Sequence, residues 1–507
     1  MSETFAPDEI AILQPYVTNV EQPIFALRNL PEEVVAVLFA YYSRSRESLR
    51  RNLLKLIQEQ DLDLDRRLRW ADLAQDDLAS AKRKAREFHE KWVVGYGHAS
   101  VAEHAVAHLA IEDVSIVASK LVEDARLASY TEKSTRYVVF DRDKFYREPS
   151  ILNSRHARRY QETCGALLDT YTRLTEPLLA AIMKHAPRGP RQSDRAFEGA
   201  CRAKACDVLR YLLPAATLTN IGMTINGRAL EQLIGKLLSH PLAEAQQVGA
   251  AMKAEAQQII PTLIKYADVN PYLMETRRAM EDCAAGALHG APPTGSAAVV
   301  LVRYPADAED QLVAALLYGY AAHPLAQIDA CVRTLAAEEK VRILDEYLKR
   351  RGPHDQPLRA LEHLTYTFDI LVDFGAYRDI QRHRMVTQTP QETTALHGYS
   401  TPPEIERYGL TNAYRARMDE AAAAYAAIAA DLPREAQYVL PLAYKKRALF
   451  TWNLREIHHF VQLRSGRQGH EAYRRIAHQV FRELERVQPL LARYIRVDLQ
   501  DYSLARL

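Results

Sequence analysis

Residues 438–455 read YVLPLAYKKRALFTWNLR, and residues 211–228 read YLLPAATLTNIGMTINGR. Both stretches open with Tyr, contain a Leu-Pro pair, and place an Asn-x-Arg triplet 12 residues after the proline. A shared order of residues at a shared spacing indicates an internal repeat. The chain is therefore predicted to contain two copies of one structural unit.

A second pair of motifs supports the repeat. Glu103-His104 and Glu362-His363 are 259 residues apart, whereas the two Leu-Pro prolines are 227 apart. The first copy therefore holds about 32 extra residues, which we expect to include residues 185–197. Residues 283–297 are rich in Ala, Gly and Pro, which predicts a linker. The expected domains are then residues 1–282 and 298–507, each large enough to bury a core.

Most of the remaining chain has the apolar spacing of helices. Residues 412–432 and 471–487 are predicted helices, and residues 365–370 alternate with the period of two that is typical of a strand. We therefore expect an α+β fold in each copy, with helices packed on short strands.

Charge and composition exclude several classes of protein. The 507 residues contain 66 Lys and Arg against 64 Asp and Glu, a net charge of +2, so no nucleic-acid partner is expected. The five cysteines form no CxxC pair, which indicates a reducing compartment. The chain starts without a basic leader or an apolar signal core, and it has no apolar run that could span a membrane. These features predict a cytoplasmic protein that contacts no membrane.

Two polar motifs are candidates for binding an anion. Arg382-His383-Arg384 follows an expected helix at residues 374–381, and the planar guanidinium group binds anions and electron-rich rings. Ser134 and Arg136 are expected on one side of a short extended segment, which suits a phosphate. Taken alone, the first motif is better explained as a solvated basic turn, and the second as a polar edge strand.

Histidines near the first Glu-His pair raise the question of a metal. His104 and His108 would share one face of a helix, but this stretch resembles a strand and lacks the HExxH order. The second copy also has no counterpart of His108. No metal site is expected, and no glycine-rich dinucleotide loop, Walker loop or GxSxG motif is present in the sequence.

Together these motifs resemble the flavin-dependent thymidylate synthase family, whose signature has the form RHRxxSxNxxSxR. Residues 97–104 resemble the element upstream of the signature, and residues 126–137 resemble its back. Arg382-His383-Arg384 resembles its front. The first copy has lost the front, where Asp124-Ala125 stand instead, and the second copy has lost the back at residues 387–394.

Two further arginines of the family divide between the copies in the same way. Arg210 matches the substrate-binding arginine before the Leu-Pro proline, and Gln437 does not. Arg464 matches the arginine that activates the pyrimidine, and Leu237 does not. In the family, one subunit gives the front of the signature and the late arginine, and its neighbour gives the rest. The resemblance therefore implies one composite site built from both copies and one inactive site.

The resemblance implies that the protein methylates dUMP to dTMP, with FAD as cofactor and methylenetetrahydrofolate and NADPH as co-substrates. Arg382 and Arg464 would be catalytic, because they would polarise the uracil. The residues expected to bind dUMP are Glu132, Ser134, Thr135, Arg136, Arg210, Arg382 and Arg464. Those expected to contact FAD are His98, Ser100, Glu103, Glu132, Asn226, Arg228, Arg382, His383, Arg384, Asn453, Arg455 and His459.

Three departures from the family keep the substrate open. Thr131 replaces the signature Asn, Asp379 stands where the family often has Gln, and residues 353–361 form a longer loop. The alternatives are a flavin-dependent C5-methylase or hydroxymethylase of another pyrimidine nucleotide, and a non-catalytic homologue that binds flavin or nucleotide. Because the family works as a homotetramer, we expect a homodimer of this tandem chain.

Overall fold

The computed structural model describes residues 4–42, 45, 47–58, 99–188, 191–295 and 297–502. His98, residues 189–190 of the predicted extra segment and Ser296 of the predicted linker lie outside the described residues. The chain divides into two compact units. The first comprises Met1–Glu112, Leu127–Glu132 and Asn220–Gly290, and the second Asp113–Arg126, Lys133–Thr219 and Ala291–Leu507.

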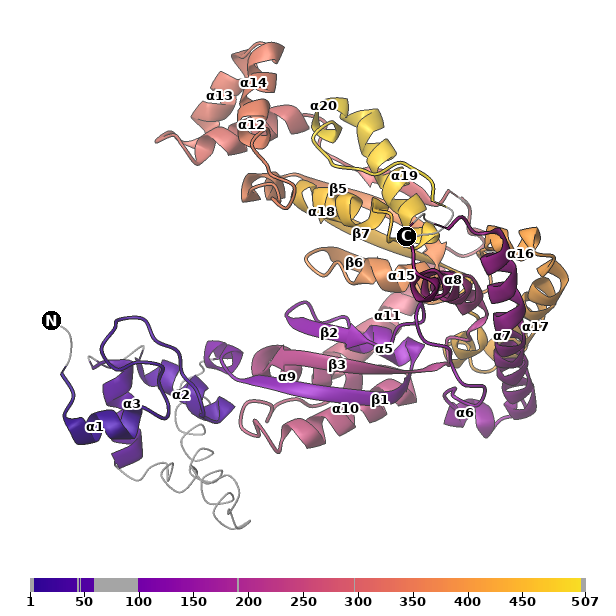
Figure 1. The fold of residues 1–507 in the computed structure, drawn as a ribbon, viewed down its shortest axis with the longest axis horizontal. Helices are drawn as coiled ribbons and strands as arrows, with labels where there is room; N and C mark the ends of the chain where they lie inside the picture. Colours follow the sequence, from indigo (N-terminus) through magenta and orange to yellow (C-terminus); the bar gives the residue numbers. More distant parts are fainter. Residues whose placement is uncertain are drawn as a thin grey trace. The chain divides into compact units, whose positions relative to one another are not determined.

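The first unit contains most of a three-stranded sheet in the order β1-β3-β2. Its strands are β1 (Val106–Ser115), β2 (Ala128–Glu132) and β3 (Leu218–Asn226). β2 and β3 are antiparallel, with Ala128 opposite Ile225. Among its described residues, the helices are α1 (Pro7–Leu13), α2 (Glu32–Tyr42), α3 (Leu49–Gln58), η3 (Ala99–Glu103), α9 (Gly227–Leu238), α10 (Ala243–Ala256) and α11 (Pro271–Ala287); Figure 1 labels the α-helices.

The second unit is built on an antiparallel four-stranded sheet in the order β4-β5-β7-β6. Its strands are β4 (Val299–Arg303), β5 (Thr365–Asp373), β6 (Thr387–Pro390) and β7 (Lys445–Asn453). The helices that precede β4 in the chain are α5 (Ile116–Val122), α6 (Pro149–Leu152), α7 (Ala157–His185), α8 (Asp194–Leu209) and η4 (Arg210–Leu212).

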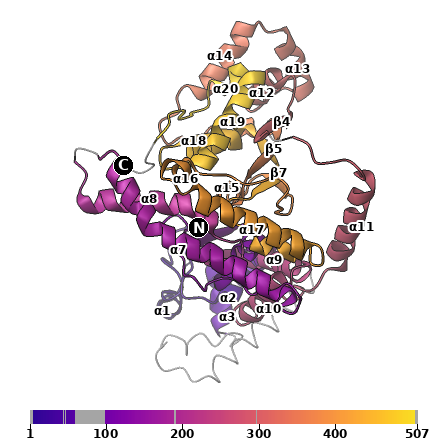
Figure 2. The ribbon, with the colours of Figure 1, turned by 90° about the vertical axis from the view of Figure 1, so that its right-hand side faces the viewer.

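The remaining helices of the second unit follow β4 in the chain. They are α12 (Ala308–Tyr318), α13 (Leu325–Thr334), α14 (Ala337–Leu348), η5 (Arg359–His363), α15 (Phe374–Gln381), α16 (Pro403–Arg407), α17 (Thr411–Ala429), η6 (Glu435–Val439), α18 (Leu454–Ser465), α19 (Glu471–Val487) and α20 (Pro489–Ala492). α18 and α19 pack against each other beside the sheet, and the long helices α7 and α17 lie side by side (Figure 2).

The core of the second unit lies where β5 pairs with β7. Tyr366 and Phe368 of β5 and Phe450 and Trp452 of β7 are fully buried. The ring of Trp452 lies 5.3 Å from that of Phe450 and 5.4 Å from that of Phe368, between centroids. Tightly packed aromatic rings bury large apolar areas, so this strand pair is a rigid base for the helices that follow it.

The order of elements repeats in the two halves of the sequence, which confirms the predicted α+β fold in two tandem copies. In each half the Glu-His pair ends a short helical turn that leads to a strand and a helix: η3, β1 and α5, then η5, β5 and α15. The Leu-Pro segment leads likewise to β3 and α9, and to β7 and α18. Equivalent ion pairs also occur, since Arg228 Nη1 is 2.6 Å from Glu103 Oε1 and Arg455 Nη1 is 2.9 Å from Glu362 Oε1.

Two predicted helices have the expected bounds, two predicted elements differ at their ends, and one prediction is wrong. The helix predicted at residues 412–432 is α17, and the strand predicted at 365–370 is β5, which continues to Asp373. The helices predicted at residues 374–381 and 471–487 are α15 and α19. The extended segment predicted through Ser134 and Arg136 was wrong, because residues 135–137 form a turn. Ser134 Oγ accepts a hydrogen bond from the backbone N–H of Arg136 at 3.2 Å. Such local bonds to a serine hydroxyl compete with strand pairing.

The linker and the domain bounds stay predictions. The first residues of the predicted linker, 283–287, are the last residues of α11. The boundary between the two compact units, after Gly290, falls within the predicted linker. Among the described residues, no helix combines the length and the apolar character that crossing a lipid bilayer requires.

Candidate functional site

Two of the predicted site arginines contact Asp379 in the second unit, and the charges of two more act on its carboxylate. Arg210 Nη1 is 3.4 Å from Asp379 Oδ2, and Arg464 Nη2 donates to the backbone oxygen of Asp379 at 2.6 Å. Burial raises the pKa of Asp379, but the charges of Arg210, Arg382, Arg464 and Arg136 lower it to about 2. Asp379 is therefore ionised at neutral pH and neutralises guanidinium groups from both halves of the sequence.

A second carboxylate, Asp207 on α8, holds Arg136. The Nε and Nη2 atoms of Arg136 donate to the two carboxylate oxygens at 2.6 and 2.8 Å, and the two side chains are 11 and 8% exposed. Burial raises the pKa of Asp207, but the hydrogen bond from Arg136 and nearby positive charges bring it below its usual value. The two parallel bonds fix the plane of the guanidinium group.

Tyr473 on α19 connects Arg136 with Arg464. Its hydroxyl accepts a hydrogen bond from Arg136 Nη1 at 2.9 Å, and its ring centroid lies 5.7 Å from Arg136 Cζ and 5.2 Å from Arg464 Cζ. Guanidinium groups at this distance are attracted to the aromatic ring. Tyr473 therefore brings an arginine from each half of the sequence to one ring.

The Tyr473→Phe variant is expected to be less stable by roughly 1.5 kcal/mol, because it keeps the ring but removes one hydrogen bond to a charged donor. The measurement is urea denaturation. A matched control is Tyr502→Phe. The ring of Tyr502 also contacts an arginine, Arg474, and its hydroxyl donates a hydrogen bond to Asp498 near the protein surface. A Tyr473→Phe variant as stable as the wild type would contradict this role.

Arg210 is buried, and some of its N–H donors are not used in hydrogen bonds within the described residues. It is only 1% exposed, yet its Nε and Nη2 atoms have no hydrogen-bond partner among the described residues. A Cβ atom at Gly375 would lie 3.4 and 3.5 Å from these two atoms, so the start of α15 packs beside the guanidinium group. Because unpaired buried donors cost free energy, Arg210 fits an anionic group that would supply the missing acceptors.

His470 lies beside the arginine cluster, next to Asp207. Its Nδ1 accepts from the backbone N–H of Ala472 at 3.1 Å, so its Nε2 carries the proton and donates to the backbone oxygen of Asp207 at 3.2 Å. Burial and the charge of Arg210 lower the pKa of His470 to about 3. His470 is therefore neutral, and it lines a cavity of about 80 Å³ together with Asp207 and Tyr211.

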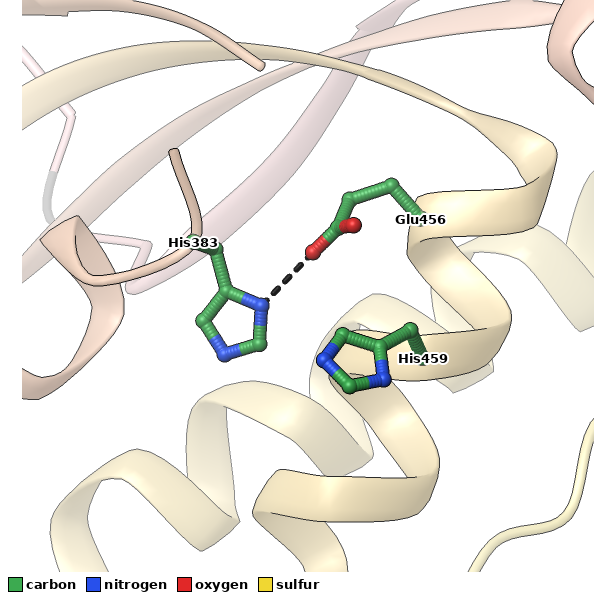
Figure 3. Close-up of side chains that lie close together, drawn as sticks. All are labelled: His383, Glu456 and His459. Carbon is green, nitrogen blue, oxygen red and sulfur yellow. Dashed lines mark hydrogen bonds and ion pairs between the residues drawn. The ribbon is translucent and has the colours of Figure 1, made fainter. Parts of the chain in front are cut away.

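His383 is buried beside two side chains from α18, as Figure 3 shows. Glu456 and His459 lie on neighbouring turns of this helix, and Glu456 Oε1 is 2.6 Å from His383 Nδ1. The possible ligand atoms of the three residues all lie within 4.8 Å of one another, which is the spacing of a metal site. However, Arg464 Nε donates to His383 Nε2 at 2.9 Å, so the neutral ring has its proton on Nδ1 and offers no free lone pair.

The other predicted residues of the second unit lie near this cluster or cap a helix. Thr135 is buried, and its hydroxyl accepts a hydrogen bond from Arg378 at 3.4 Å. Arg384 Nη1 donates to the backbone oxygen of Arg126 at 3.0 Å. Asn453 Oδ1 caps α18 by accepting from the backbone N–H of Glu456 at 2.8 Å.

The remaining predicted residues belong to the first unit. They are Ser100, Glu103, Glu132, Asn226 and Arg228. Asn226 caps α9, and Glu132 is the buried last residue of β2. His98 lies outside the described residues.

Sequence reasoning missed Asp207, Tyr473, His470 and Glu456. Asp207 precedes Arg210 by three residues on a helical stretch, so the sequence alone would have suggested an ion pair between these two neighbours. The structure pairs Asp207 with Arg136 instead, 71 residues away. No spacing in the sequence points to Tyr473, because its two arginines come from distant segments.

Comparisons with known proteins place this chain in a family. A family model described as "Thymidylate synthase complementing protein" matches residues 46–262 and 300–490. A UPF0159 protein of Chlamydia pneumoniae is 37% identical over 100% of this chain and 97% of its own length. A UPF0159 protein of Thermoplasma acidophilum is 30% identical over 84% of this chain and 91% of its own length.

More distant relatives match a smaller part of the chain. The flavin-dependent thymidylate synthase of Pyrococcus furiosus is 26% identical over 40% of this chain and 76% of its own length. A crystal structure of the Helicobacter pylori enzyme, complexed with FAD and dUMP, has a TM-score of 0.31 and 16% identity, and covers 39% of this chain and 100% of that one. From the two matched segments and the full-length relatives, the chain belongs to the thymidylate synthase complementing protein family.

Proposed function

We propose that this protein is an FAD-dependent thymidylate synthase that converts dUMP to dTMP with methylenetetrahydrofolate and NADPH, at one composite site. The observation that supports this best is the meeting of Arg136 and Arg210 with Arg382 and Arg464 around Asp379. Each pair comes from a different half of the sequence, and each is the pair that its half retains from the family pattern.

The charge of the cluster suits a nucleotide monophosphate. The four guanidinium groups outnumber the carboxylates of Asp207 and Asp379, even when the nearby Asp373 is added, and His383 and His470 are neutral. A phosphate monoester carries close to two negative charges at neutral pH. Arg136 and Arg210 would bind the phosphate, and the unpaired N–H groups of Arg210 fit its oxygens.

Arg382 and Arg464 would act on the pyrimidine. Arg464 is half-buried and held through Nε and Nη2, while its Nη1 donates no hydrogen bond within the described part of the chain. A fixed guanidinium group would stabilise negative charge that develops on the uracil oxygens. Ser134 and Thr135 complete the proposed dUMP site within the second unit, and Glu132 of the first unit is proposed as a contact from the resemblance alone.

The donor set at the end of α15 fits a flavin. Arg382 is exposed and Arg384 is half-buried, and both present guanidinium groups that can bind a pyrophosphate or an electron-rich ring. Arg382, His383, Arg384, Asn453, Arg455 and His459 would hold the cofactor on the second unit. The resemblance to the family alone supports the further proposed FAD contacts, which are His98, Ser100, Glu103, Glu132, Asn226 and Arg228. Bound FAD would supply the redox chemistry, and the chain would supply orientation and charge.

Complementation of a thymidine-requiring bacterial strain tests the proposal, and growth without thymidine is the expected result. In vitro, the purified protein should bind FAD and release tritium from [5-³H]dUMP. Release from labelled UMP alone would favour another pyrimidine nucleotide, a reading that Asp379 in place of the family's Gln keeps open. A protein that takes up no FAD and supports no growth would overturn the proposal.

The proposal also covers the organisation of the protein. With the function we also propose two domains, at residues 1–282 and 298–507. The protein is proposed to form a homodimer and to be located in the cytoplasm. Sedimentation at twice the chain mass of 57.5 kDa is the expected result for the dimer.

A further inference from the structure

Both ring nitrogens of His383 are in use, and their order is fixed. Arg464 Nε is always a donor, so His383 Nε2 must accept its hydrogen bond, which is 2.9 Å long. The neutral imidazole then carries its proton on Nδ1, which donates to Glu456 Oε1 at 2.6 Å. The three side chains therefore form one directed chain of hydrogen bonds, from Arg464 through His383 to Glu456.

This chain determines how Arg464 is oriented. One edge of its guanidinium group is fixed by two acceptors, His383 Nε2 and the backbone oxygen of Asp379. The ring of Tyr473 lies beside it. If the proton of His383 moved to Nε2, two donors would face each other, and Arg464 would lose one of its two acceptors.

Glu456 stabilises the proton on Nδ1 by accepting its hydrogen bond, and this acts together with the donor Arg464 Nε on the other side of the ring. Glu456 lies on the first turn of α18, and Arg464 lies on the last turn of the same helix. His383 follows α15, so the hydrogen-bonded chain ties the end of α15 to both ends of α18. The titratable and charged groups around the pair are Arg455, His459 and Arg464 on α18 and Asp379 on α15, with Glu362 of η5 bound to Arg455.

We propose that Glu456 is a positioning residue, which fixes the tautomer of His383 and thereby aims Arg464 at the nucleotide. The inference rests on the proposed function for the role of Arg464, and on the hydrogen bonds alone for the tautomer. It assigns Glu456 a role beyond the motifs that resemble the family signature.

Glutamine and leucine variants of Glu456 separate this role from a merely structural one. Glutamine keeps an acceptor oxygen for His383 Nδ1, whereas leucine has a similar volume and no acceptor. NMR of ¹⁵N-histidine-labelled full-length protein reads the tautomer, with His383→Gln to assign the signal. We expect the Nδ1–H form in the wild type and in Glu456→Gln, and a shift towards Nε2–H in Glu456→Leu.

Kinetics and a double-mutant cycle give the second measurement. Glu456→Leu should lower kcat/KM for dUMP about tenfold, through kcat, and Glu456→Gln should restore most of the loss. In an Arg464→Ala background, Glu456→Leu should have no further effect, because its target is absent. His383→Gln places an amide oxygen near the position of Nε2, so it should make Arg464 independent of Glu456.

The two arms distinguish the inference from the proposed function. An unchanged tautomer in Glu456→Leu would overturn the inference even if the enzyme makes dTMP. Equal losses in the glutamine and leucine variants, or a full tenfold loss in the Arg464→Ala background, would also overturn it. A protein without dUMP chemistry would refute the proposed function, while the tautomer measurement would still test the hydrogen-bonded chain.

Discussion

Replacing Arg464 by alanine is expected to lower kcat/KM for dUMP by about 10²–10³-fold, the usual cost of one preorganised donor in a transition state. Two hydrogen bonds hold the guanidinium group of Arg464 before any ligand arrives, to His383 and to the backbone of Asp379. A donor that needs no reorganisation stabilises developing charge most effectively. Tritium release from [5-³H]dUMP measures the effect, and the variant should also fail to support growth without thymidine.

Arg467 offers a matched control for this experiment. It is an exposed arginine three residues further along the chain, and its Cζ lies 5.3 Å from the ring centroid of Tyr502. Arg467→Ala removes the same charge and should change kcat/KM by less than about twofold, because an exposed charge contributes little. Equal losses in the two variants would contradict the role given to Arg464.

Replacing Asp207 by leucine is expected to lower the free energy of unfolding by about 3–5 kcal/mol. The change leaves the guanidinium group of Arg136 buried without its two charged acceptors, and Arg136 is only 11% exposed. Tyr473 would remain as a neutral partner for Nη1. Urea denaturation of the apoprotein measures the loss.

Two further variants show whether the uncompensated charge is the cause. Arg136→Met combined with Asp207→Leu should recover most of the stability, because an apolar pair of similar volume replaces the ion pair. Glu162→Ala breaks the Arg158–Glu162 pair, whose side chains are 88 and 59% exposed, and should change stability by less than about 0.5 kcal/mol. A double variant as unstable as Asp207→Leu would show that packing, and not charge, sets the loss.

The sequence predicted the repeated architecture because the repeat is local and periodic. The Glu-His and Leu-Pro motifs each lie next to a strand, and apolar spacing identified α19 to the residue. The prediction failed at Ser134 and Arg136, where a hydroxyl bonded to the backbone makes a turn. Alternation over a few residues does not distinguish a strand from such a turn.

The partners of the arginines could not be predicted in the same way. The division of arginines between the two halves suggested that Arg136, Arg210, Arg382 and Arg464 act together. It gave no information on what keeps four like charges in one region. In the sequence, Asp379 is only a departure from the family pattern, and its ion pair with Arg210 joins positions 169 residues apart. Long-range ion pairs depend on tertiary packing, which leaves no period in the sequence.

The placement of these arginines in one compact unit of one polypeptide has a consequence for experiments at low concentration. Arg136 and Arg464 both lie in the second unit and are joined through Tyr473, so no bimolecular step is needed to bring them together. A site shared between separate subunits would come apart on dilution, by mass action. Here nanomolar protein should retain the same affinity for a nucleotide as micromolar protein, and the ratio of the contributing halves is fixed at one to one by translation.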